Sequence, residues 1–183
     1  LAYIVHDRYV KGMTAAETYR RPVFNLFAWA VEAIPVDRGT PDREAIRASI
    51  QALHNGWVLY IAPEGTRNHD GTLEEGKAGV TLILRRAGTD IPIYPVRFIG
   101  LENFWPNFKR LRCMPTRIVM GESFFLDPPT NAGRREVREQ MMTEMMAQIA
   151  ALLPSEHRGP YADQVGEPPQ YLRFASPPPD HKG

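Results

Sequence analysis

The residue types best suited to chemistry stand together in Pro63-Glu64-Gly65-Thr66-Arg67, at the end of an apolar run. The guanidinium of Arg67 offers a planar fork of donors that suits a phosphate or a carboxylate. Gly65 permits a turn or a close backbone approach that a side chain would block. Glu64 adds a carboxylate to the same short loop. The stretch therefore fits two interpretations, an anion-binding loop and an ordinary strand-end turn held by a Glu64–Arg67 ion pair.

Residues 57–62, which precede this loop, are apolar on both alternating faces. That pattern is typical of a central strand in a parallel sheet that helices cover on both sides. Pro63 has no N–H group to donate to a sheet ladder, so the strand is predicted to end there. Because ligands of such sheets bind at the carboxyl ends of the strands, the loop at 63–67 is predicted to face a ligand.

Arg38 stands at the end of a second predicted strand, the short apolar piece Ile34–Val36. Asp37-Arg38-Gly39 breaks the apolar pattern and marks the strand end. If the two strands are parallel, Arg38 lies on the same side as the loop at 63–67. A solvated arginine is the alternative.

Two amphipathic helices are predicted beside these strands. The first begins at residues 40–41, a cap followed by a first-turn proline, and ends at residues 55–56; its inward residues are Ile46, Ile50 and Leu53. The second ends near Gly88 and has apolar residues at helical spacing, namely Val80, Ile83, Leu84 and Ala87. Lys77 stands at its first turn, where it either adds a cation near the loop or is simply solvated.

The remaining elements follow from the same patterns. Residues 91–99 predict a strand, so strand, helix and strand imply a right-handed parallel crossover. Residues 117–126 predict a strand interrupted at Gly121-Glu122. Residues 131–153 predict a long helix whose apolar face is Met142, Met145, Met146, Ile149 and Leu152. At the amino end, Leu1, Ile4 and Val5 share a helical face, residues 14–17 have the form of a capping box, and a short helix is predicted from Pro22.

Composition excludes several classes of function. The 183 residues hold 22 Lys and Arg against 21 Asp and Glu, without a basic run, so nucleic-acid binding has no support. The single Cys113 excludes an internal disulfide and a cysteine-cluster metal site. No stretch has the roughly 18 apolar residues of a membrane span. The chain opens within an apolar element, which predicts a cut inside a domain.

Three apparent motifs are rejected. Residues 71–77 have the spacing of a phosphate-binding P-loop, but Ala78 stands where a magnesium ligand is needed, acidic residues would repel phosphate, and no apolar strand leads in. His69 with Glu74 is interpreted as a polar loop. His6 has no carboxylate five residues beyond it and is interpreted as a surface histidine. No metal site is predicted.

Four blocks carry a family resemblance: Ile34-Pro35-Val36-Asp37-Arg38, Pro63-Glu64-Gly65-Thr66-Arg67, Gly76-Lys77-Ala78-Gly79 and Ile91-Pro92-Ile93-Tyr94-Pro95-Val96. In order and spacing they resemble the blocks of the glycerophospholipid acyltransferases, the family of lysophosphatidic acid and glycerol-3-phosphate acyltransferases. The resemblance runs from about the amino terminus to Leu153. One departure is serious, because the family's catalytic His-x-x-x-x-Asp motif does not occur in this chain and is expected before Leu1.

The resemblance implies a mixed α/β fold, with a largely parallel sheet flanked by helices, as in glycerol-3-phosphate acyltransferase. It implies an acyltransferase domain at 1–153, incomplete at its amino end, and the proline content predicts an extended, partly disordered tail at 154–183. The implied reaction moves a fatty acyl group from acyl-CoA or acyl-carrier protein to a lysophospholipid or glycerol phosphate in phospholipid biosynthesis, with no cofactor. By this resemblance the substrate-binding residues are Arg38, Glu64, Gly65, Thr66, Arg67 and Lys77.

The implied partners are the acyl donor, the phosphate-bearing lipid acceptor and a membrane surface. The expected place is the cytoplasmic face of a membrane, with peripheral attachment or an anchor in segments outside this chain. Residues 101–112 mix aromatic and basic side chains, which fits either an interfacial segment or a loop over the core edge. Two competing functions remain: a lipid-phosphate or acyl-chain binding module without catalysis, and, less supported, a metal-dependent phosphate-handling enzyme.

Overall fold

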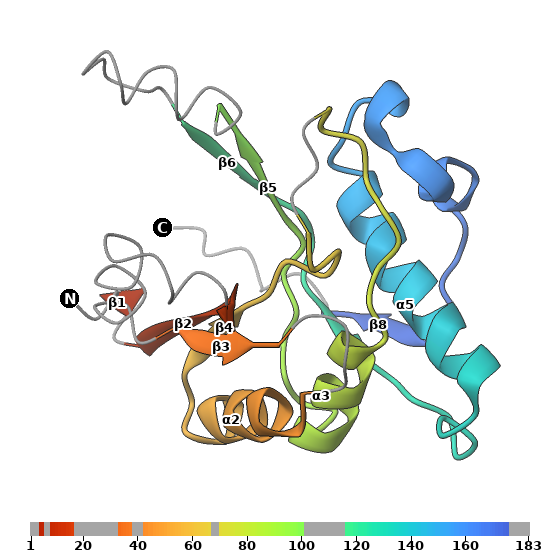
Figure 1. The fold of residues 1–183 in the computed structure, drawn as a ribbon. Helices are drawn as coiled ribbons and strands as arrows, with labels where there is room; N and C mark the ends of the chain where they lie inside the picture. Colours follow the sequence, from red (N-terminus) through yellow and green to blue (C-terminus); the bar gives the residue numbers. More distant parts are fainter. Residues whose placement is uncertain are drawn as a thin grey trace, which may run out of the picture. The chain divides into compact units, whose positions relative to one another are not determined.

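The structure is a computed structural model that describes residues 4–5, 8–16, 33–37, 42–66, 70–100 and 116–175. The chain divides into two compact units. The first comprises Leu1–Thr66 and Gly76–Ile91, and the second comprises Arg67–Glu75 and Pro92–Gly183. Helices and strands alternate along much of the chain, which confirms the predicted mixed α/β class (Figure 1).

The sheet of the first unit is organised around β2, Arg8–Ala15. It pairs antiparallel with β1, Ile4–Val5, and parallel with both β3, Ile34–Val36, and β4, Val58–Tyr60. The register places β2 residues 13–15 opposite β3 and residues 10–12 opposite β4. The strand predicted at Ile34–Val36 and its parallel relation to the strand before Pro63 are therefore confirmed.

The helix predicted at the amino end is wrong, because Ile4 and Val5 form β1 and the next described residues form β2. The capping box is also wrong at its start, since Thr14 and Ala15 end β2 in register with β3. Pairing with neighbouring strands supplies the backbone hydrogen bonds here, and this tertiary context overrides a short helical spacing. The short helix predicted from Pro22 lies outside the described residues.

Helix α2, Arg43–His54, connects β3 to β4 and packs against both strands and against α3 (Figure 1). Its fully buried residues are Ala45, Ser49 and Ala52, whereas Ile46, Ile50 and Leu53, which were predicted to point inward, are half-buried. Small side chains on this face let the helix approach its neighbours closely, and the larger ones lie at the margins. The helix ends at Asn55 and Gly56, as predicted, with Gly56 at a φ of 75°.

Strand β4 is shorter and more exposed than predicted. It spans only Val58–Tyr60, and the side chains of Val58 and Tyr60 are 40% and 46% exposed. The prediction of a strand buried on both faces is therefore wrong for these residues: an apolar run marks a strand but does not provide the neighbours that would cover it. Helix α3, Gly79–Ala87, follows the loop, buries Thr81, Ile83 and Leu84, and ends at Gly88 as predicted.

In the second unit, β5, Val96–Ile99, pairs antiparallel with β6, Arg117–Met120. The predicted crossover within one sheet is not confirmed, because β5 belongs to a separate two-stranded sheet with β6, and the strand is shorter than the predicted 91–99. Pro92 and Pro95 remove two ladder donors, which leaves Ile93 as a single bridge to Phe124 before β5 begins. The predicted break at residues 121–122 is confirmed, because β6 stops there and β7, Phe124–Leu126, resumes beyond it.

The core of the second unit lies along α5, Arg135–Ala150, a shorter helix than the predicted 131–153. Its methionine face is confirmed: Met142, Met145 and Met146 are buried, together with Met141. A buried carboxylate, that of Glu144, accepts hydrogen bonds from the Tyr171 backbone N–H at 2.8 Å and from the Gln140 amide at 3.3 Å. Both oxygen atoms of this buried carboxylate therefore accept a hydrogen bond.

The chain beyond Pro154 is regular as far as residue 175. It forms the 3-10 helices η3, Ser155–His157, and η4, Gly159–Gln164, and then β8, Leu172–Phe174, antiparallel to β7. The predicted extended conformation is wrong for the two 3-10 helices, whereas β8 is extended. Tyr161 and Leu172 are buried. Residues 176–183 lie outside the described part, and the domain boundary at 153 stays a prediction.

Among the described helices, none is long and apolar enough to cross a membrane. The aromatic and basic segment at 101–112 lies outside the described residues, as does Cys113.

Candidate functional site

The carboxyl ends of β3 and β4 open onto the same edge of the sheet. Both strands run parallel to β2, so both chains leave the sheet in one direction. Asp37 follows β3, and the loop from Ile61 to Thr66 follows β4. This edge is where ligands of open α/β sheets bind.

A tight turn shapes the loop after β4. The Gly65 N–H donates to the Ala62 carbonyl at 3.1 Å, and Gly65 has a φ of 67°, which favours glycine. The Lys77 N–H donates to the Pro63 carbonyl at 2.8 Å. Residues 14 positions apart in the sequence are thereby held together, and the start of α3 lies against the loop.

Gly65 and Lys77 are in close contact. A Cβ atom added to Gly65 would lie 3.4 Å from Cγ of Lys77, at the limit of ordinary contact. The aliphatic part of Lys77 therefore packs along the glycine backbone, while its ammonium group extends from the same place. Lys77 therefore lies beside the loop, and its role in binding stays a prediction.

Tyr60 is a member of the site that the sequence did not indicate. Local burial of its hydroxyl and, second, the negative charge of Glu64 raise the pKa of Tyr60, although the whole side chain is 46% exposed. The phenol therefore stays protonated at neutral pH and can donate a hydrogen bond. Its place in an apolar run concealed it, and only the folded loop brings its hydroxyl within electrostatic range of Glu64.

The amino end of α3 has no side-chain cap. Its N-cap residue is Ala78, no side-chain capping hydrogen bond is present, and its first turn contains no acidic residue. One first-turn donor is already used, because the Val80 N–H donates to the Lys77 carbonyl at 3.2 Å. A helix start of this kind carries partial positive charge that favours an anion, and Lys77 and the glycine turn lie beside it.

Four of the predicted site residues lie in the described part of the chain. Gly65 and Lys77 are in contact, Glu64 is partly buried beside Tyr60, and Thr66 is exposed. Arg38 and Arg67 lie outside the described residues. The substrate-binding roles of all these residues stay predictions.

Within the described ranges, no group of three His, Cys, Asp or Glu side chains is placed to hold a metal ion. The contacts described above between this loop and the start of α3 include a backbone hydrogen bond and the packing of the Lys77 stem.

Comparison with known proteins identifies the family. Residues 1–99 match the family model named Acyltransferase. The chain belongs to the acyltransferase family. Its Asp-Arg block, its Glu-Gly-Thr-Arg loop, its Gly-Lys segment and its Pro-Ile-Tyr-Pro block all fall within these residues, so the resemblance found in the sequence is confirmed.

One relative is the Caenorhabditis elegans protein named "Putative 1-acyl-sn-glycerol-3-phosphate acyltransferase acl-2", which is 36% identical over 89 residues. The match covers 46% of this chain and 30% of that protein, so the chain spans less than a third of the length of this relative. No solved structure matches the chain.

Proposed function

We propose that the protein containing this chain transfers a fatty acyl group from acyl-CoA or acyl-carrier protein to a hydroxyl of a lysophospholipid or glycerol phosphate. Family membership supports acyl transfer, and the name of the Caenorhabditis elegans relative supports a glycerophospholipid acceptor. The proposed role lies in phospholipid biosynthesis. The proposed place is the cytoplasmic face of a membrane, to which the protein attaches peripherally or through segments outside this chain.

The observation that carries the proposal is the packing of Lys77 against Gly65 at the uncapped start of α3. A phosphate bound there meets a cation and helix donors, and the missing side chain at position 65 lets it approach the backbone. Arg67 and Arg38 complete the phosphate site in this proposal. Glu64 orients Arg67 or an acceptor hydroxyl, and Thr66 adds a hydroxyl to the same loop.

Holding the acceptor by its phosphate fixes its hydroxyl for attack. The hydroxyl oxygen bonds to the thioester carbonyl carbon, the carbon–sulfur bond breaks, and the hydroxyl proton passes through a base to the departing thiolate. This sequence contains no His-x-x-x-x-Asp motif, which supplies the base in the proteins it resembles. We therefore assign binding of the acceptor to this chain and proton transfer to residues outside it.

Replacing Arg67 by Ala in the complete protein tests the proposal. A charge-assisted hydrogen bond contributes about 1.5 to 3 kcal/mol, so kcat/KM for the acceptor should fall by about one to two orders of magnitude. Thiol release from the thioester donor measures the rate. Arg67→Lys should recover part of the loss, because it restores the charge but not the planar fork.

Arg135→Ala is the matched control. Arg135 is an exposed arginine of α5 that pairs with Glu139 at 2.7 Å, and its loss should leave acceptor kinetics unchanged. Equal kinetics for Arg67→Ala and the wild-type protein would refute the role of Arg67. A complete protein that binds the acceptor but releases no thiol would favour the second candidate, a non-catalytic binding module, for which the missing motif is the supporting observation.

A further inference from the structure

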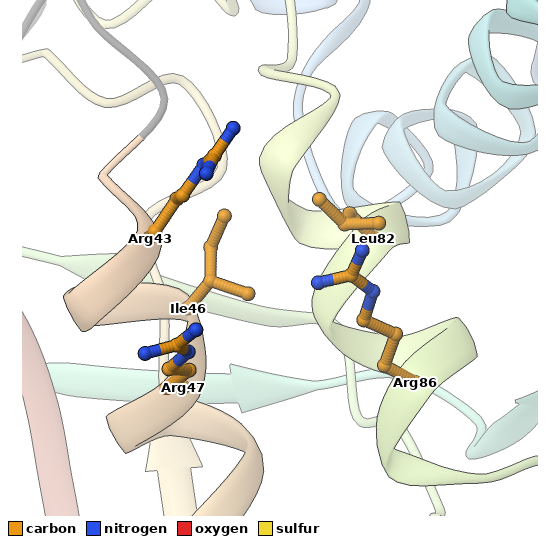
Figure 2. A pocket seen from close by; sticks show the side chains of 5 residues that line it. All are labelled: Arg43, Ile46, Arg47, Leu82 and Arg86. Carbon is orange, nitrogen blue, oxygen red and sulfur yellow. The ribbon is translucent and has the colours of Figure 1, made fainter.

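The first unit has a groove between α2 and α3 that the acceptor site does not use. Arg43, Ile46 and Arg47 line it from α2, and Leu82 and Arg86 line it from α3 (Figure 2). Its volume is about 330 Å³. Small-molecule sites begin at about this size.

The charges around the groove are of one sign. Arg43 and Arg47 are one helical turn apart on α2, and such like-charged pairs destabilise a helix. Figure 2 shows the Arg86 side chain of α3 extending toward the α2 side. In the part of the chain that the structure describes, none of these three guanidinium groups forms a hydrogen bond or an ion pair, and Glu44, the one acidic residue of α2, does not pair with them.

The floor of the groove is apolar. Ile46 and Leu82 face each other from the two helices and are half-buried (Figure 2). Arginine binds phosphate through two parallel hydrogen bonds and stacks on aromatic rings. Arginines around an apolar floor therefore match a ligand that joins several phosphates to a flat ring, which describes a nucleotide with more than one phosphate.

A membrane surface fits less well, because a flat array of headgroups would leave a concave apolar floor unfilled. The groove also lies at a suitable distance from the acceptor loop. Arg86 lies seven residues beyond the start of α3, which is about 10 Å along the helix axis from the acceptor loop. A ligand held here by its nucleotide could extend an acyl-bearing arm toward that loop.

We propose that the groove between α2 and α3 binds the phosphate-bearing nucleotide of a coenzyme A thioester, held by Arg43, Arg47 and Arg86. The identity of the donor rests on the proposed function. Nucleotide binding does not, because it can be measured without turnover.

Calorimetric titration of the 183-residue chain with adenosine 3′,5′-bisphosphate at low salt tests the proposal. We expect binding that weakens as salt rises. Arg43→Gln, Arg47→Gln and Arg86→Gln should each weaken it about tenfold or more. Adenosine, which lacks phosphate, and pyrophosphate, which lacks the ring, should each bind more weakly than the bisphosphate.

Arg85→Gln is the matched control, since Arg85 is a neighbouring α3 arginine that does not line the groove. Its affinity should stay within about twofold of wild type, and circular dichroism should show that all four variants are folded. No binding by the wild-type chain, or equal affinity in the groove variants and the control, would overturn the proposal.

Vesicles containing anionic phospholipid are the competing probe. Arginine-dependent binding to vesicles without binding of the bisphosphate would assign the groove to a membrane surface and overturn the nucleotide site. If the bisphosphate binds as expected but the complete protein transfers no acyl group, the nucleotide site is supported and the proposed acyl transfer is refuted. The experiments therefore distinguish a failure of the nucleotide site from a failure of the proposed function.

Discussion

The amino ends of α2 and α3 each follow a strand that pairs with β2, but they are built differently. At α2 the carboxylate of Asp42 accepts hydrogen bonds from the backbone N–H groups of Glu44 at 3.1 Å and Ala45 at 2.9 Å, and from that of Asp37 at 2.9 Å. At α3 the corresponding residue is Ala78, without any side-chain cap. The side-chain cap of α2 stabilises the helix, whereas the start of α3, which lacks such a cap, can donate backbone hydrogen bonds to a ligand.

Charged side chains with and without an internal hydrogen-bond partner also differ between the two units. The buried carboxylate of Glu144 has two donors within its own unit, and the cluster around it is apolar. By contrast, Arg43, Arg47 and Arg86 have no partner among the described residues. The Glu144 carboxylate thus stabilises the fold through internal hydrogen bonds, whereas the three groove arginines keep their donors available to a ligand.

The largest effect is expected from a negative charge at the uncapped end. Ala78→Asp should lower kcat/KM for the acceptor in the complete protein by about tenfold or more, because the carboxylate competes with the acceptor phosphate for the helix donors. Stability should change little, because Ala78 has helical dihedral angles, φ −59° and ψ −11°, and not the extended conformation from which a side chain caps a helix. Thiol-release kinetics and urea unfolding measure the two effects. Ala78→Asn, which adds a neutral side chain, is the control and should have a smaller kinetic effect. Unchanged kinetics in both variants would show that the uncapped start of α3 does not bind the acceptor phosphate.

Removing the existing cap comes second. Asp42→Ala should lower the free energy of unfolding by about 1 kcal/mol at pH 7, since two first-turn donors of α2 lose their acceptor. Glu44→Ala, in the same turn, is the control and should cost less than about 0.5 kcal/mol. Urea unfolding at pH 7 measures both. Equal losses would mean that charge near the helix end, and not capping, provides the stabilisation.

The same cap has a defined pH dependence. Hydrogen bonds from the backbone N–H groups of Ala45 and Asp37 lower the pKa of Asp42 from its ordinary value of 3.8. Because the folded-state pKa is the lower one, the stabilisation is fully present above pH 3.8 and is lost as the pH falls through the folded-state value. The stability difference between wild type and Asp42→Ala should therefore shrink only below about pH 4.

An effect of similar size on stability is expected at the loop glycine. Gly65→Ala should cost about 1 kcal/mol, because alanine is strained at a φ of 67°; its Cβ would make only an ordinary contact with Lys77. Gly79→Ala is the control, since Gly79 is helical with open space around its Cβ position, and it should stabilise by a few tenths of a kcal/mol. A tolerated alanine at position 65 would show that the loop does not need its glycine turn.

Local patterns predicted the elements whose boundaries are set by their own residues. Gly56 and Gly88 end α2 and α3, and the apolar spacing of α3 was sufficient to place it. Predictions failed where the pairing of a segment with another strand, and not its own residues, decides its structure. Ile4 and Val5 had helical spacing but are strand residues, and residues 91–99 were predicted to join the sheet of β4, whereas β5 pairs with β6 in a separate sheet.

At the candidate site, the sequence by itself determined the residue types, the family and the loop of Glu64, Gly65 and Thr66, because these follow from local order along the chain. Only the tertiary structure decided that Lys77 packs on Gly65, that Tyr60 titrates under the influence of Glu64, and that arginines from two helices surround one groove. Tyr60 and Glu64 are only four residues apart and are brought together by the local turn, whereas the other two features join residues distant in the sequence. Their proximity depends on how strands and helices pack, and no spacing along the chain encodes it.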